Sequence, residues 1–174
     1  MFYKDEALAV FVDGYSTFNA AKSVGMSIDY KKLRDEFTRR GKLKTLQYYS
    51  LLDRNDDVSP IRPMLDWMAY NGFHVTTKQP TVFEDGSGHK RIKGSIDVEM
   101  ALDIVAYAKY VDHIVLFSGA RDLTYAAQMA QRLGTRFSVA STINGDGFTC
   151  ADELRPQADN FISLENLRSV IAQD

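Results

Sequence analysis

Hydrophobic and polar positions follow two patterns along the chain. A short apolar run predicts a buried strand at 7–14, and strands are also expected at 43–52, 73–78, 113–119 and 136–142. Segments in which apolar residues recur three and four positions apart predict helices at 16–25, 29–41, 59–72, 95–111 and 122–134. Strands that alternate with helices favour an α/β fold, in which a mostly parallel sheet is covered by helices on both faces.

Capping and turn signals refine this pattern in two places. Ser59 is expected to cap the helix at 59–72, with Pro60 at its first helical position. The polar, glycine-rich segment 79–94 contains Asp85-Gly86, a pair that is typical of a hairpin tip. We therefore expect a hairpin between the third strand and the fourth helix.

Composition narrows the class of protein. The 174 residues contain no repeat or linker and are expected to form one domain, 1–174. The net charge of −2 and the pI of about 5.9 exclude a global basic field, so a nucleic-acid partner would need a local basic patch. The single cysteine, Cys150, excludes a disulfide within the chain and a cysteine-rich zinc site. No apolar run reaches the roughly 18 residues of a membrane span. The N-terminal segment is too polar for a signal peptide, so we expect a cytoplasmic protein with no membrane partner.

Acidic residues gather at the expected carboxyl edge of the sheet. Asp13 ends the first strand, Asp97 lies in the first turn of the fourth helix, and Asp122 begins the helix after the fourth strand. Each acid alone also fits a helix cap or a partner for the helix dipole. Together they favour a bound Mg²⁺ or Mn²⁺, because converging carboxylates repel one another and oxygen ligands suit these ions. Asp103 shares a helix face with Glu99, and that pair also fits a solvated stripe.

Four segments resemble one known family: FVDGYSTFNAAKSVG, KGSIDVEMALDIV, HIVLFSGARDL and STINGDGFTCADELRPQADNFISL. In their order and over nearly the whole chain they are similar to the LabA/DUF88 branch of the NYN domains, within the PIN-like nuclease superfamily. The resemblance implies a three-layer α/β/α fold and metal-dependent ribonuclease activity. It implies catalytic, metal-binding acids at Asp13, Asp97 and Asp122, with Asp103 as a further metal ligand.

Two motifs depart from the pattern of that family. The first motif resembles Asp-Gly-x-Asn, but here DGYS places Ser16 at the asparagine. The later motif resembles Ser-Gly-Asp-x-Asp-Phe. In this chain SGARDL places Ala120 at its first acid, Arg121 at a small residue and Leu123 at the aromatic. Arg121 would then replace part of the charge of a metal or bind an anion such as a phosphate. The acidic site is therefore expected to be a reduced one.

Several side chains are expected to contact a substrate beside these acids. Tyr15 can stack on a base or on a small aromatic ligand, while Ser16, Ser118 and Arg121 lie at the same edge of the sheet. The expected hairpin carries basic residues that can hold a phosphate backbone, although a solvated loop explains them equally well: His89, Lys90, Arg91 and Lys93.

Three functions stay open on these grounds. The first is a Mg²⁺- or Mn²⁺-dependent ribonuclease that cleaves single-stranded RNA with a reduced acidic site. The second is a catalytically silent RNA-binding or regulatory module. The third is an enzyme that acts on a small polar ligand in the cleft where related proteins would cleave RNA. The apolar and aromatic helix at 59–72 would support a homodimer, but core packing explains its composition equally well.

Overall fold

A parallel sheet forms the centre of the molecule. The structure, a computed structural model, describes residues 1–53, 59–84, 86–88 and 90–173. Six strands follow one another in the order β3-β2-β1-β6-β7-β8, and every neighbouring pair is parallel. The strands are β1 (Ala7–Asp13), β2 (Lys42–Leu51), β3 (His74–Lys78), β6 (His113–Phe117), β7 (Arg136–Ser141) and β8 (Asn160–Ser163).

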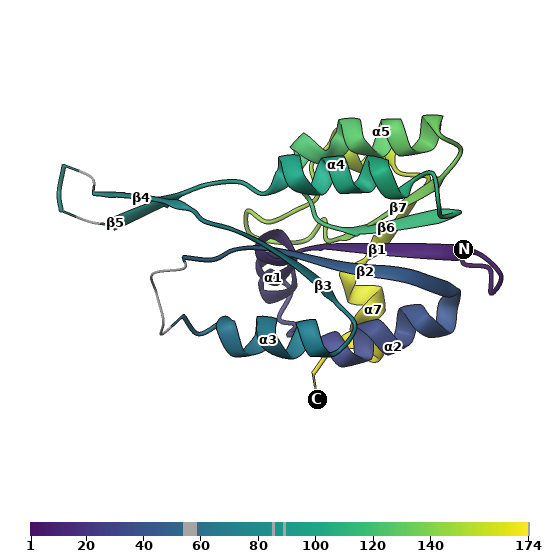
Figure 1. The fold of residues 1–174 in the computed structure, drawn as a ribbon, viewed down its shortest axis with the longest axis horizontal. Coiled ribbons are helices and arrows are strands. Elements are labelled where there is room, and N and C mark those ends of the chain that lie inside the picture. Colours follow the sequence, from purple (N-terminus) through teal and green to yellow (C-terminus); the bar gives the residue numbers. More distant parts are fainter. Residues whose placement is uncertain (54–58, 85, 89, 174) are drawn as a thin grey trace.

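Helices cover both faces of this sheet (Figure 1). One face carries α1 (Gly14–Ser23), α2 (Tyr30–Arg40), α3 (Arg62–Tyr70) and α7 (Leu164–Ile171). The other face carries α4 (Asp97–Tyr107), α5 (Thr124–Arg132) and the short α6 (Leu154–Gln157), and a 3-10 turn, η1 (Arg121–Leu123), precedes α5. The predicted three-layer α/β/α fold is confirmed.

The core is divided into two layers by the sheet. In β1 the side chains of Val10 and Val12 pack against α1, α2, α3 and α7, whereas Ala9 and Phe11 pack against α4, α5 and α6. Successive residues of a strand point to opposite faces, so a strand that is buried on both faces must be apolar throughout. This is why the first strand is a continuous apolar run. The strand ends at a polar residue, Asp13, at the carboxyl edge of the sheet.

Several predicted helix starts differ from the structure by a few residues, and two of the differences have a visible cause. Helix α1 begins at Gly14, before the expected start, because Asp13 caps it directly: its carboxylate accepts the backbone N–H of Ser16 at 3.1 Å. Helix α3 begins at Arg62, so the prediction of a Ser59 cap with Pro60 in the first helical position is wrong. The Ser59 carbonyl accepts the backbone N–H of Arg62 at 3.2 Å, which makes a turn ahead of the helix.

One strand of the sheet has no counterpart in the sequence prediction. Strand β8 is short, and its residues are all half-buried at the edge of the sheet beside β7. Edge strands with one neighbour lack the long apolar run that marks central strands. The expected apolar signature is therefore absent from this element.

A hairpin projects beyond the carboxyl end of the sheet (Figure 1). Strands β4 (Thr81–Glu84) and β5 (Lys90–Lys93) pair antiparallel, which confirms the predicted hairpin in segment 79–94. Asp85, predicted at its tip, lies outside the described residues.

Helix α3 is the apolar helix for which the sequence suggests a homodimer. Its Leu65 and Met68 are buried in the core, so packing accounts for part of its apolar character. The homodimer stays a prediction.

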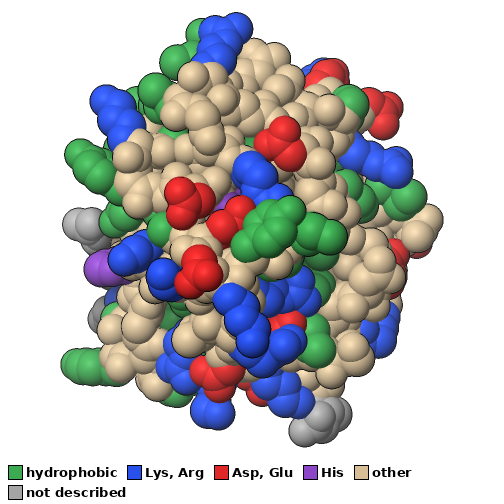
Figure 2. All heavy atoms as spheres, turned by 90° about the vertical axis from the view of Figure 1, so that its right-hand side faces the viewer, with side chains coloured by type: hydrophobic (Ala, Val, Ile, Leu, Met, Phe, Trp, Pro, Cys, Tyr) green, Lys and Arg blue, Asp and Glu red, His purple; other side chains and the backbone are tan. Residues whose placement is uncertain are grey.

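The opposite end of the molecule carries mixed charge. At the amino ends of the strands, acidic and basic side chains are interspersed (Figure 2), and Arg136 pairs there with Glu6 at 2.7 Å. Among the described residues, no helix combines the length and the apolar character that crossing a bilayer requires.

Buried His113, at the start of β6, couples stability to pH. Its Nδ1 accepts a hydrogen bond from Arg136 Nη2 at 3.1 Å, and its Nε2 lies 2.7 Å from Ser138 Oγ. Burial lowers the pKa of His113 to about 4; the charge of Arg136 lowers it as well, and the nearby carboxylate of Glu6 opposes both. The folded protein therefore keeps this imidazole neutral under mildly acidic conditions.

We expect the free energy of unfolding to fall by about 2–3 kcal/mol through His113 alone as the pH drops from 6.5 to 4. In that window the unfolded chain binds a proton that the folded chain rejects, so acid favours unfolding. Urea titrations across the window should show a smaller pH slope for His113→Gln than for the unchanged protein. His74→Gln, which removes an exposed imidazole, is the control, and an equal slope in His113→Gln would contradict the assignment.

Candidate active site

The carboxyl ends of β1 and β6 meet where the strand order reverses. From β1 the sheet grows through β2 to β3 on one side, and the chain then returns to place β6 against the other side of β1. In open parallel sheets this switch point leaves a crevice beyond the strand ends. Asp13 ends β1 and Ser118 follows β6, and the Ser118 hydroxyl donates to the Asp13 carboxylate at 2.9 Å.

Asp13 is a buried acid that donors hold in place. The residue is 7% exposed, and its Oδ1 accepts the Ser16 backbone N–H while its Oδ2 accepts the Ser118 hydroxyl. Burial raises the pKa of Asp13 and the negative charge of Asp97 raises it further, whereas the hydrogen bonds from Ser16 and Ser118 lower it. A buried carboxylate that faces a second acid is a common electrostatic feature of functional sites.

Asp97 and Asp13 line one cavity of about 290 Å³. Asp97 begins α4, just after the base of the hairpin, and its backbone N–H donates to Ser95 Oγ at 3.1 Å. The Ser95 hydroxyl in turn donates to the Asp97 carboxylate. Gly119 and Ala120 form another part of the wall, so Ala120 borders the cavity at the position where the family pattern has an acid.

The other two predicted acids do not join this pair. Asp122 is exposed in η1 and is not among the residues that line the cavity, because the chain has already passed the cavity at Gly119 and Ala120. Asp103 is engaged elsewhere: the buried Tyr49 hydroxyl donates to its carboxylate at 2.7 Å. Within the described parts of the chain, no three His, Cys, Asp or Glu side chains form a group that could hold a metal ion. Of the three predicted catalytic acids, Asp13 and Asp97 meet at one cavity and Asp122 lies outside it, and the catalytic and metal-binding roles stay predictions.

The predicted substrate contacts fall into two groups. Ser16 lines the cavity, and its hydroxyl accepts the Gly119 backbone N–H at 3.0 Å, which ties α1 to the turn after β6. Ser118 does not line the cavity; it is buried behind Asp13 and positions that carboxylate. Tyr15 is 71% exposed at the rim, where its ring packs edge-on against Phe148 at a centroid distance of 6.1 Å.

The predicted cations lie around the cavity rather than in it. Arg121 is exposed and pairs with Glu153 at 3.3 Å, and it is not among the cavity-lining residues. Its guanidinium faces a carboxylate outside the cavity, and its part as a site cation stays a prediction. Lys93 is exposed on β5, directly before Gly94 and Ser95 of the cavity wall. His89 lies outside the described residues, and so do the side chains of Lys90 and Arg91.

Sequence reasoning missed the loop that closes the cavity. Gly147, Phe148 and Thr149 line it, and the aromatic ring of Phe148 within a polar loop was the available signal. Cys150, next along the chain, is buried, and burial raises the pKa of its thiol to about 11. The thiol is therefore protonated at neutral pH and unsuited to nucleophilic attack.

The residues present fit a hydrated divalent cation. Mg²⁺ usually keeps several waters and is held by one or two carboxylates rather than by a cage of protein ligands. Asp13 and Asp97 supply two carboxylates, and Ser16 and Ser95 supply hydroxyls along the same cavity. This set contains only oxygen donors, which suits Mg²⁺ or Mn²⁺ and not a soft metal.

Gly14 is required where α1 leaves the site. A Cβ at this position would lie 2.5 Å from Tyr48 Oη and 2.9 Å from the Tyr49 carbonyl oxygen. We expect Gly14→Ala to lower the free energy of unfolding by about 1–3 kcal/mol, since the new methyl group overpacks a filled space. Urea unfolding measures the change, with Gly86→Ala as the control because nothing surrounds its Cβ position within 4 Å. Equal effects of the two substitutions would contradict this packing.

Comparison with known proteins agrees with the geometry. The NYN domain family matches residues 7–165. The low amplitude and bright protein LabA of Synechococcus elongatus is 31% identical over 176 residues, which cover 98% of this chain and 90% of the relative.

A solved structure extends the comparison to the fold. The crystal structure of a protein of unknown function from Vibrio parahaemolyticus superposes with a TM-score of 0.75 at 20% identity and covers 99% of both chains. The family match and the LabA relative both span nearly all of the sheet and the acidic cavity. The chain therefore belongs to the NYN domain family.

Proposed function

We propose that the protein is a metal-dependent ribonuclease that cleaves single-stranded RNA with Mg²⁺ or Mn²⁺ held by Asp13 and Asp97. The observation that carries the proposal is the meeting of these two acids on one cavity at the switch point of the sheet. Family membership supports it, since NYN and PIN-like nucleases generally depend on divalent metals and NYN domains generally bind RNA.

The residues of the chain take distinct parts in this reaction. A divalent cation, when bound, would lower the pKa of a water and stabilise negative charge on the phosphate. Asp13 and Asp97 would hold the cation, and Ser118 fixes the Asp13 carboxylate so that it faces the cavity. The Ser16–Gly119 hydrogen bond holds the two walls of the site together.

The rim of the cavity suits an unpaired strand better than a duplex. Tyr15 and Phe148 present exposed aromatic surface beside the two acids. Stacking of a base on such rings needs a base that is free of its own helix, and it tolerates any base identity. Lys93, exposed at the foot of the hairpin, can contact the phosphate backbone as it leaves the cavity.

Cleavage of a mixed single-stranded RNA pool with Mn²⁺ tests the proposal. We expect the unchanged protein to cleave, and Asp13→Asn to reduce cleavage at least 100-fold, because metal stabilisation of the transition state is worth several kcal/mol. Asparagine keeps a side-chain oxygen at the helix cap, so the variant should fold. Cleavage that persists in EDTA or in Asp13→Asn would exclude this site as the source of activity.

A silent RNA-binding module is the second candidate, and one observation favours it. Ala120 brings a methyl group to the cavity wall where the family pattern has a carboxylate, which leaves two acids for the metal. A silent module would bind the RNA pool but leave it intact with Mn²⁺, and Asp13→Asn would bind as tightly as the unchanged protein. The nuclease proposal predicts cleavage in the same mixture.

A further inference from the structure

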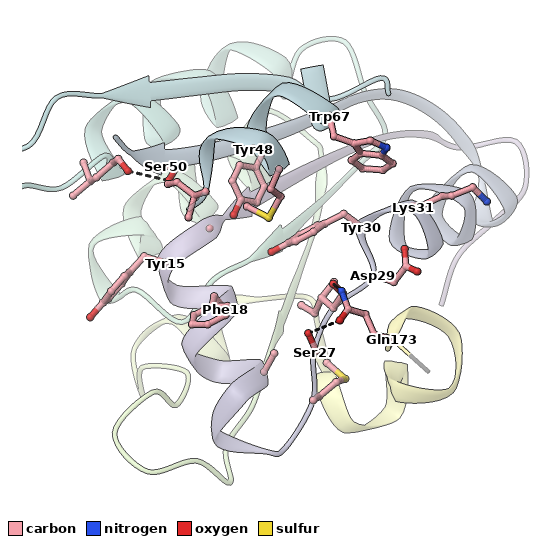
Figure 3. Close-up of a pocket in the computed structure, with 17 residues that line it drawn as sticks. Tyr15, Phe18, Ser27, Asp29, Tyr30, Lys31, Tyr48, Ser50, Trp67 and Gln173 are labelled. Carbon is pink, nitrogen blue, oxygen red and sulfur yellow. Dashed lines mark hydrogen bonds between the residues drawn. The ribbon is translucent and has the colours of Figure 1, made fainter. Parts of the chain in front are cut away.

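We infer that the large groove beside the acidic cavity is a base-binding subsite for single-stranded RNA. This inference rests on the proposed function and names how its substrate is held. The groove has a volume of about 620 Å³ and lies between α1, α2, α3 and β2 (Figure 3). That volume falls in the range of pockets that enclose small molecules, and it exceeds the volume of one base.

The groove and the acidic cavity adjoin each other. Tyr15, Ser50 and Leu51 line both of them, so the two spaces share a wall. Helix α1 divides the two spaces: Ser16 faces the cavity, whereas Phe18 faces the groove. A strand whose phosphate lies at Asp13 and Asp97 therefore has its neighbouring base at the entrance of the groove.

The walls of the groove offer aromatic surface for stacking. Tyr15 and Phe18 lie on α1 at one end, and Trp67 of α3 lies at the other, with the rings of Tyr48 and Tyr30 between them (Figure 3). Phe18 is 58% exposed, a large apolar surface for a side chain beside a site. Stacking on rings of this kind strengthens the binding of any base, so it does not require a fixed RNA sequence.

The charges around the groove favour a neutral base over a phosphate as its occupant. The only charged residues that line the described groove are Asp29 and Lys31, and both already have partners: Asp29 accepts the Lys32 backbone N–H at 2.9 Å and Lys31 pairs with Asp35 at 3.4 Å. A phosphate would therefore meet the negative charge of Asp29 and a single lysine that is already paired at the surface. A neutral, planar base has a smaller desolvation cost than a phosphate on entering an apolar space, and it can keep hydrogen bonds at its edge.

Polar groups within the groove can serve the edge of a base. The hydroxyls of Tyr30 and Tyr48 line the groove, and burial raises the pKa of both, so both stay neutral hydroxyls. At the far end the Ser27 hydroxyl donates to Gln173 Oε1 at 3.0 Å. Hydroxyls and an amide can donate to or accept from the edge of a base, whereas an acyl chain or an apolar peptide face offers these groups no hydrogen bond.

Trp67 provides a direct test, because it is the single tryptophan of the chain and lines the groove. The full-length protein is titrated with a short oligoadenylate in EDTA, where metal-dependent cleavage cannot occur, and tryptophan fluorescence is recorded. We expect saturable quenching, and about tenfold weaker binding of the same sugar–phosphate backbone without bases. Phe18→Ala is expected to weaken oligoadenylate binding by about tenfold as well.

A matched control separates the groove from general loss of aromatic surface. Tyr70→Ala removes a 91% exposed ring from α3, the helix of Trp67, but Tyr70 does not line the groove, so binding should be unchanged. Urea unfolding of both variants verifies that they fold. Equal binding of the base-free backbone, full binding by Phe18→Ala, or quenching by an apolar dye with which RNA does not compete would overturn the inference.

The outcome is independent of whether the protein cleaves RNA. Base-dependent quenching without Mn²⁺-dependent cleavage would keep the groove and reject the nuclease. Cleavage without base-dependent quenching would keep the nuclease and reject the groove.

Discussion

Asp97→Asn is expected to reduce Mn²⁺-dependent RNA cleavage at least 100-fold while the free energy of unfolding changes by less than about 1 kcal/mol. Asp97 shares its cavity with Asp13, and its charge raises the pKa of Asp13, so the two carboxylates act on the same space. Asparagine keeps the hydrogen bond with Ser95 but loses the charge that attracts the cation. Initial cleavage rates and urea unfolding measure the two effects separately.

Two acids outside the cavity supply matched controls for this substitution. Asp103 lies on α4, the helix that Asp97 begins, and Asp122 follows β6, yet neither side chain lines the cavity. The control substitutions are Asp103→Asn and Asp122→Asn. Both variants are expected to keep most of the cleavage rate. A loss in Asp122→Asn as large as in Asp97→Asn would contradict the two-acid site and restore the group of three predicted from the sequence.

Ala120→Asp is expected to strengthen Mn²⁺ binding and raise the cleavage rate, each by about 10- to 100-fold. Ala120 lines the cavity, so an aspartate there adds a third carboxylate beside Asp13 and Asp97. Attraction to a divalent ion at close range exceeds the added repulsion among acids, which leaves a net gain of a few kcal/mol at most. Residue 120 also has the extended backbone of the cap of η1, where aspartate is favoured over alanine.

The matched control for this gain is Ala106→Asp. It adds the same charge at an exposed position of α4, away from the cavity, and should change neither metal affinity nor rate. Metal titration and cleavage are measured in parallel for both variants. Weaker Mn²⁺ binding in Ala120→Asp would contradict the placement of the cation between Asp13 and Asp97.

The fold was predictable because local and global signals agree. Val10, Val12, Ala9 and Phe11 must all be apolar in a strand that is covered on both faces, and helices alternate with such strands throughout. Disagreement arose at the start of α3, where proline and serine signals favour a cap but the turn from the Ser59 carbonyl delays the helix. The single domain over 1–174 stays a prediction.

The site was predictable only in part, because strand ends are encoded locally and side-chain directions are not. Asp13 follows a strand and Asp97 begins a helix, and these positions alone indicate the sheet edge. The path of the chain between Ser118 and Asp122 decides whether the last acid reaches the cavity, and no sequence pattern specifies that path. The ion pair of Arg121 with Glu153 joins positions far apart in sequence, so no local pattern indicates it.

The apolar groove lay beyond sequence reasoning for a similar reason. Phe18, Tyr30 and Trp67 come from three helices, and each fits an ordinary amphipathic pattern by itself. Only the arrangement of these helices around β2 leaves their rings around a common space. Aromatic residues at helical spacing are thus ambiguous until the packing is known.

The central claim is that Asp13 and Asp97 hold one divalent cation. Electron paramagnetic resonance of free Mn²⁺, titrated with the full-length protein, measures stoichiometry and affinity without any substrate. We predict one Mn²⁺ bound per chain, at least tenfold weaker binding in Asp97→Asn, and unchanged binding in Asp122→Asn. Absence of Mn²⁺ binding, or equal binding by the unchanged protein and Asp97→Asn, would contradict the claim.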